Sequence, residues 1–173
     1  MTQSNEEVYA EPFDFTAKEV VFEPPEAGIQ EAIFVDIVDL GLSQYKDNAP
    51  QRRIALVWQL SEFVPDIEPK QRHVVHSYCT PSFGLKSNLR KALDGMTKGG
   101  IDPREARKGI RVSDYIGTRC ALVIKHQASV DGSRIYANVD AITVSKAKGR
   151  PWDTSGYVRP PYLVKKDDNE VSD

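Results

Sequence analysis

The stretch Leu85–Met96, with the sequence LKSNLRKALDGM, separates two groups of strand-like segments. Its apolar residues recur every three or four positions, which is the spacing of one face of an α-helix: Leu85, Leu89, Leu93 and Met96. The stretch therefore predicts an amphipathic helix whose apolar face covers one end of a β structure. The basic residues Lys86 and Arg90 fall largely off that face.

Three strand-like runs precede this helix, at 29–40, 52–60 and 72–80, and two follow it, at 119–126 and 135–142. The last two are separated by Asp131-Gly132, a strong hairpin signal. Five strands with a helix after the third is the element order of an OB-fold, a small Greek-key barrel whose open face commonly binds oligonucleotides. We therefore expect an all-β, five-stranded Greek-key OB-fold barrel with one or two helices.

Local patterns refine this expectation. The first run changes its alternation between Asp36 and Asp39, which indicates a β-bulge of the kind that lets a barrel strand bend. In the second run Trp58 shares a face with Ile54, Leu56 and Leu60, so we interpret it as a core residue. Asp102 and Pro103, followed by Glu105, are typical of the start of a second, short helix.

Charge and proline content divide the 173 residues into three parts. Residues 1–27 are acidic and contain Pro12, Pro24 and Pro25, so we expect an arm; residues 28–150 form the OB-fold domain. Residues 151–173 are a tail, first rich in proline and aromatic residues and then acidic. The formal net charge of −2 hides a basic middle: residues 29–150 carry 19 basic and 13 acidic side chains. A basic body suits a polyanionic ligand.

Several other functions lack the residues they need. No apolar run approaches the roughly 20 residues that span a bilayer, and the acidic start indicates no signal peptide, so we expect a protein of the bacterial cytoplasm. Cys79 and Cys120 are expected to be buried thiols and not a disulfide. We expect no cofactor. A metal site is disfavoured because His73, His76 and Cys79 are spaced by three, which puts neighbours on opposite faces of a strand.

Catalysis is also disfavoured, because neither a nucleophile motif nor a phosphate-binding glycine loop is present. A metal-dependent nuclease needs two or three convergent carboxylates, and the basic body offers only scattered ones, Asp36, Asp39 and Asp140. We therefore expect a protein that is not an enzyme, and a nuclease remains an alternative.

Binding of single-stranded nucleic acid needs cations along the backbone and exposed rings on which bases stack. Tyr136 points away from the core by alternation, beside Arg134 and Asn138. Further aromatic candidates are Tyr45 in the first loop, Phe83 before the helix, and Tyr78. The candidate phosphate contacts are Arg53, Arg72, Lys86, Arg90, Lys125 and Lys146.

Four ordered blocks of the chain resemble a known family: EAGIQEAIFVDIVDLG, RRIALVWQLSE, YCTPSFGLKSNLRKAL and YIGTRCALVIKH followed by YANVDAITVSKAKG. They are similar to bacteriophage OB-fold proteins encoded among replication and recombination genes and regarded as single-stranded DNA-binding proteins. The resemblance covers about residues 24–150 and implies a barrel that coats single-stranded DNA. The acidic C-terminus departs from cellular single-strand-binding proteins, since it lacks their Pro-Phe ending.

The expected function is therefore non-catalytic, sequence-tolerant binding of single-stranded DNA. The acidic residues 167–173 are expected either to compete with DNA for the groove or to bind a phage or host replication or recombination protein. An OB-fold interaction module that recruits a recombinase, helicase loader or host factor is the first alternative. Homo-oligomerisation, for which residues 1–27 are the candidate segment, stays open at this point.

Overall fold

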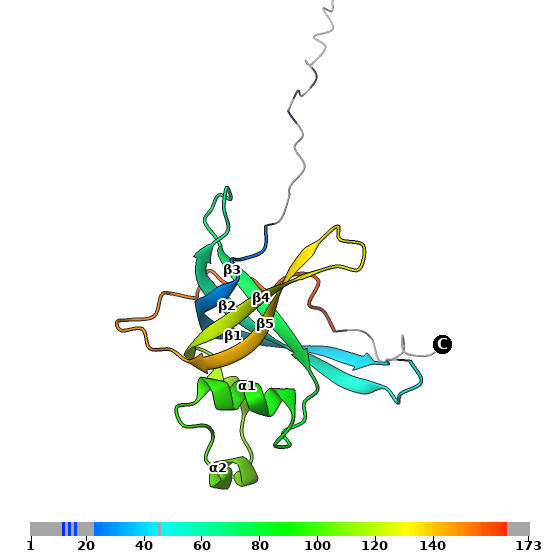
Figure 1. Cartoon of the computed structure of the whole chain (residues 1–173), viewed down its shortest axis with the longest axis vertical. Helices are drawn as coiled ribbons and strands as arrows, with labels where there is room; N and C mark the ends of the chain where they lie inside the picture. Colours follow the sequence, from blue (N-terminus) through cyan, green and yellow to red (C-terminus); the bar gives the residue numbers. More distant parts are fainter. Residues whose placement is uncertain (1–11, 13, 15, 17–22, 45, 166–173) are drawn as a thin grey trace, which may run out of the picture.

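The computed structural model describes residues 12, 14, 16, 23–44 and 46–165. Its strands are β1 (Gly28–Ser43), β2 (Gln51–Phe63), β3 (Arg72–Cys79), β4 (Arg119–Ala128) and β5 (Ile135–Val144). Its helices are α1 (Asn88–Met96) and α2 (Pro103–Lys108), with a 3₁₀ turn at Val112–Tyr115. The predicted order of five strands, with the main helix between the third and the fourth, is confirmed (Figure 1).

The five strands form one antiparallel sheet in the order β3-β2-β1-β4-β5. β3 and β5 are its two edges, and they approach each other without backbone pairing between them in the described residues. The sheet is therefore strongly curved and barrel-like, but no backbone hydrogen bonds among the described residues close it between β3 and β5. In Figure 1, α1 lies across one open end of this curved sheet, with α2 beyond it.

Strand β1 bends and pairs with two neighbouring strands. Residues 28–33 pair with β4, and residues 32–43 pair with β2. The register shifts once between Phe34 and Asp36 and again between Asp39 and Gly41. These two irregularities flank the stretch 36–39 in which the sequence predicted one bulge, and the pairing inside that stretch is regular. A bulge adds a residue to one strand and increases its local twist. Gly41 has a φ of 76°, a conformation that glycine adopts without steric cost.

The main core lies between the inner face of the sheet and α1. Trp58 is completely buried there, and its ring centroid lies 5.5 Å from that of Phe34, so its interpretation as a core residue is confirmed. Both cysteines are free and buried, and burial raises the pKa of the Cys120 thiol to about 12. Helix α1 packs so closely on β5 that a side chain at Gly95 would collide with Ile142.

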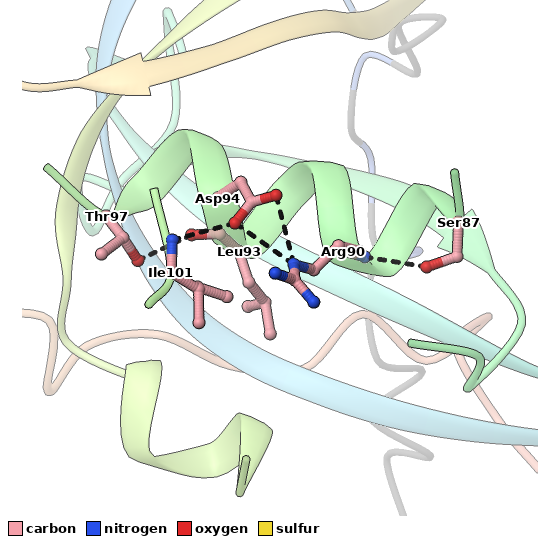
Figure 2. Close-up of polar contacts among 6 residues, drawn as sticks. All are labelled: Ser87, Arg90, Leu93, Asp94, Thr97 and Ile101. Carbon is pink, nitrogen blue, oxygen red and sulfur yellow. Dashed lines mark hydrogen bonds and ion pairs between the residues drawn. The ribbon is translucent and has the colours of Figure 1, made fainter. Parts of the chain in front are cut away.

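Helix α1 begins later than the apolar stripe predicts. Ser87 is its N-cap, and the hydroxyl oxygen accepts a hydrogen bond from the Arg90 backbone N–H at 3.2 Å (Figure 2). Leu85 therefore precedes the helix, and its side chain is 82% exposed. The later start has a local cause. A backbone N–H in the first turn of a helix has no partner within the helix, and the Ser87 hydroxyl supplies one, which fixes the helix start at Asn88.

Strand β5 also departs from simple alternation. Val139 pairs with Ile124 and Ala141 with Val123, so Asp140 is an extra residue in β5. The bulge reverses the alternation beyond Asp140. Ile142 consequently packs against the core, whereas uninterrupted alternation would place it on the same face as Tyr136.

A second, smaller core lies on the outer face of the sheet. Leu163 is buried there against Val38, Ala55 and Val57. It belongs to residues 152–165, which we call the C-terminal strap and which run along β1 and β2 to the base of their hairpin (Figure 1, orange to red). Part of the region interpreted as a tail is thus folded on the sheet, whereas residues 167–173 lie outside the described residues.

Candidate nucleic-acid interface

The outer face of the β4–β5 hairpin carries the predicted group around Tyr136. Backbone register places Tyr136 opposite Gln127, and Asn138 opposite Lys125. Tyr136 is 49% exposed, and the Asn138 amide donates to the Gln127 side-chain oxygen at 2.6 Å. Side chains opposite each other in antiparallel strands are direct neighbours. The Tyr136 ring, the Asn138 amide and the Lys125 ammonium group therefore lie side by side on the solvent-facing surface.

Lys125 in this group is paired, but weakly. Its Nζ lies 3.1 Å from Oδ2 of Asp140, and both side chains are largely exposed. Exposed ion pairs typically contribute about 0–1 kcal/mol. Lys125 can therefore exchange Asp140 for a phosphate at little cost.

The hairpin turn holds Arg134 next to this group. The Ser129 N–H donates to the Arg134 carbonyl at 2.8 Å, and the Arg134 N–H donates to the Ser129 hydroxyl at 3.1 Å. The Asp131 carboxylate accepts hydrogen bonds from the Ser129 hydroxyl and from Ser133, and these bonds lower the pKa of Asp131 to about 2. These hydrogen bonds hold the turn in one conformation, and they thereby fix the position of the Arg134 backbone beside Tyr136.

A second group lies on the outer face of β2 and β3. Tyr78 pairs with Ala55 in register, is 44% exposed, and has the Arg53 guanidinium 6.0 Å from its ring centroid. No carboxylate among the described residues forms an ion pair with Arg53. A cation over an aromatic face is the combination that a stacked base and its phosphate require.

Arg90 and Phe83 do not fit the role predicted for them. The Arg90 side chain is 7% exposed, its Nε lies 3.3 Å from both carboxylate oxygens of Asp94, and its guanidinium lies 4.8 Å from the Phe83 ring centroid. Asp94 also accepts the Ile101 N–H at 3.0 Å (Figure 2). Phe83 itself packs against the main core. Arg90 and Asp94 thus hold the end of α1 against the segment that follows it. Arg90 and Phe83 are therefore not part of the candidate interface.

Arg72 is likewise engaged within the fold. Its guanidinium lies 4.2 Å from the ring centroid of Phe63 and 4.8 Å from that of Trp152, and it donates to the Ser61 carbonyl at 2.6 Å. The Trp152 N–H in turn donates to the side chain of Gln59 at 2.9 Å. Arg72 therefore helps to attach the C-terminal strap, which is the physical reason that it is a poor candidate for a phosphate contact.

The remaining candidates are scattered. Lys86 is exposed in the loop before α1, and Lys146 is exposed after the end of β5 that is far from Tyr136. Neither joins one of the two groups just described. Tyr45 lies outside the described residues.

The strap also brings Tyr157 and Arg159, which the sequence did not single out, to the carboxylate of Asp36. The Asp36 carboxylate accepts two hydrogen bonds from Arg159, both 2.8 Å, and one from the Tyr157 hydroxyl at 2.7 Å. Burial alone would raise the pKa of Asp36, but these bonds outweigh it and hold the pKa below its ordinary value. Burial and the neighbouring carboxylate raise the pKa of Tyr157.

The carboxylates considered for a nuclease are each held by a cation. Asp36 binds Arg159, Asp39 lies 2.8 Å from Arg52, and Asp140 binds Lys125. No cluster of three metal-ligating side chains occurs among residues 23–44 and 46–165. Nor does the described part of the chain contain a helix that combines the length and apolar character needed to cross a membrane.

The comparisons with known proteins add no assignment. Neither a protein family nor a curated protein matches this chain.

Proposed function

We propose that this protein binds single-stranded DNA without catalysis, as an OB-fold protein of a phage replication or recombination system. The observation that carries the proposal is the pairing of exposed tyrosines with cations on one face of the sheet. Tyr136 lies beside Lys125 and Arg134, and Tyr78 lies beside Arg53. Rings for stacking and cations for phosphates are what sequence-tolerant binding of unpaired nucleotides requires.

The topology supports the OB-fold part of the proposal. An OB-fold is a five-stranded, partly open Greek-key barrel that binds oligonucleotides on its β2–β3 face and with the loops joining β1 to β2 and β4 to β5. This sheet is open between β3 and β5, and its helix α1 follows β3. The two tyrosine groups lie at the β2–β3 face and beside the β4–β5 loop, as this mode of binding requires. The resemblance of residues 24–150 to phage single-strand-binding proteins supports the same proposal.

Fluorescence polarisation with a labelled oligo-dT, at salt concentrations from about 50 to about 200 mM, tests the proposal directly. If about five phosphates are neutralised, the slope of log K against log salt is about −3.5. A double-stranded probe of equal length should bind more weakly. A wild-type protein that fails to bind oligo-dT at the lowest salt would contradict the proposal and favour a protein-interaction module.

The variant Tyr136→Ala identifies the surface that is used. Loss of one stacked base costs about 1–3 kcal/mol of binding free energy. Val158→Ala, at an exposed aliphatic residue of the strap, is the matched control and should leave affinity unchanged. If Tyr136→Ala binds as tightly as the wild type while remaining folded, the β4–β5 hairpin is not part of the interface.

A further inference from the structure

The C-terminal strap supplies an exposed tyrosine to the outer face of the sheet. Tyr162 is 62% exposed, and its ring centroid lies 5.6 Å from that of His76 on β3. The ring of Tyr78 lies 4.8 Å from the same histidine. Both tyrosines thus contact one half-buried imidazole and present surface to solvent.

The position of Tyr162 is fixed by its neighbours in the strap. Leu163 is only 2% exposed in the outer core, and Arg159 makes two hydrogen bonds to Asp36. Lys165 lies 3.6 Å from Asp39 at the base of the β1–β2 hairpin. Contacts before and after Tyr162 therefore hold this part of the strap against the sheet.

The side chains that are accessible around Tyr78 and Tyr162 favour a nucleotide as the ligand. The aliphatic residues of the outer face, Val38, Ala55 and Val57, are buried beneath the strap. What remains accessible is a pair of tyrosine rings, with the guanidinium of Arg53 6.0 Å from the ring of Tyr78. Rings offer stacking surface to bases of any sequence, and Arg53, which has no carboxylate partner in the part of the chain that the structure describes, complements a phosphate.

We propose that Tyr78 and Tyr162 form a base-stacking site and that Arg53 contacts the adjoining phosphate. The strap then supplies Tyr162 to the DNA-binding surface and is not a lid that must open to expose it. This inference rests on the proposed function, because it names further residues for the same ligand. It differs from that proposal in requiring a residue from the C-terminal segment.

Affinity measurements on the full chain separate the possibilities. Tyr162→Ala should weaken oligo-dT binding by about 5- to 150-fold, the range given by loss of one stacked base. Tyr162→Phe keeps the ring and should bind like the wild type. Val158→Ala, also exposed on the strap, is the matched control. If the strap is instead a lid, Tyr162→Ala will bind as tightly as the wild type or more tightly, which overturns the inference.

Photocrosslinking gives a second measurement that a purely structural role would not affect. Oligonucleotides carrying 5-iododeoxyuridine should crosslink to Tyr78 or Tyr162, as identified by mass spectrometry of the wild-type complex. Crosslinks confined to the β4–β5 hairpin would overturn the inference and leave the proposed function standing. A wild-type protein that binds no oligo-dT would overturn both.

Discussion

Replacing Leu163 by alanine tests whether the C-terminal strap belongs to the folded core. Leu163 is buried against Val38, Ala55 and Val57 on the outer face of the sheet. The substitution removes about three carbon groups, each worth about 0.8 kcal/mol on burial. Since the strap lies at the surface and can settle into part of the space, the added cavity term is small. We expect the free energy of unfolding to fall by about 2–3 kcal/mol.

The assay is urea unfolding followed by far-UV circular dichroism and by tryptophan fluorescence. Trp58 reports on the main core and Trp152 on the strap. A loss of about 2–3 kcal/mol should lower the thermal midpoint by roughly 5–10 °C for a chain of this size. The control is Val164→Ala, because Val164 is the next residue along the strap and is exposed; its effect should stay within about 0.5 kcal/mol. If Leu163→Ala is as mild as this control, the strap does not stabilise the fold and our account of the outer core is wrong.

Three further predictions concern charged residues. Asp36→Asn should lower stability at neutral pH by about 2 kcal/mol, because hydrogen bonds to a charged group are lost. The wild-type contribution is complete above the unfolded pKa of about 3.9 and disappears as pH falls through the lowered folded pKa, so wild type and variant should converge in acid unfolding curves. Arg90→Ala should destabilise the fold by about 2 kcal/mol and leave the oligo-dT affinity of the folded protein unchanged. If Arg90 instead contacted a phosphate, the variant would bind more weakly and its log K would depend less steeply on log salt than that of the wild type. Asp140→Asn should raise oligo-dT affinity about two- to threefold at low salt, because a carboxylate about 7 Å from a phosphate costs about 0.6 kcal/mol in water; equal affinities in a polarisation titration would contradict this.

The order of elements could be predicted because it depends on local patterns. Alternation and turn signals are properties of neighbouring residues, so the five strands and the Asp131-Gly132 hairpin were recognisable. The start of α1 was misplaced because a leucine at the right spacing carried more weight than the serine at position 87 that caps the helix. The Arg90–Asp94 ion pair also had a signal, since Asp94 lies four residues further along the same helix.

The strap could not be located in the same way. Its contacts join residues far apart in the chain, from 93 positions for Trp152 and Gln59 to 123 for Arg159 and Asp36, and no local pattern encodes them. One signal was nevertheless present in β2. Ala55 and Val57 alternate with Leu56 and Trp58, so both faces of the strand are apolar. Strands that are apolar on both faces are covered on both faces, and this implied a covering segment on the outside.

The burial of the outer face changes how the basic character of the domain must be interpreted. Residues 29–150 have more basic than acidic side chains, yet some of those cations are committed within the fold. Arg90 is buried beside Asp94, and the Arg72 guanidinium lies close to two rings. Arg53 has no carboxylate partner among the described residues, and Lys125 has only an exposed, exchangeable one. The charge available to a phosphate backbone is therefore set by which cations remain accessible beside tyrosines, and not by the total excess that composition gives.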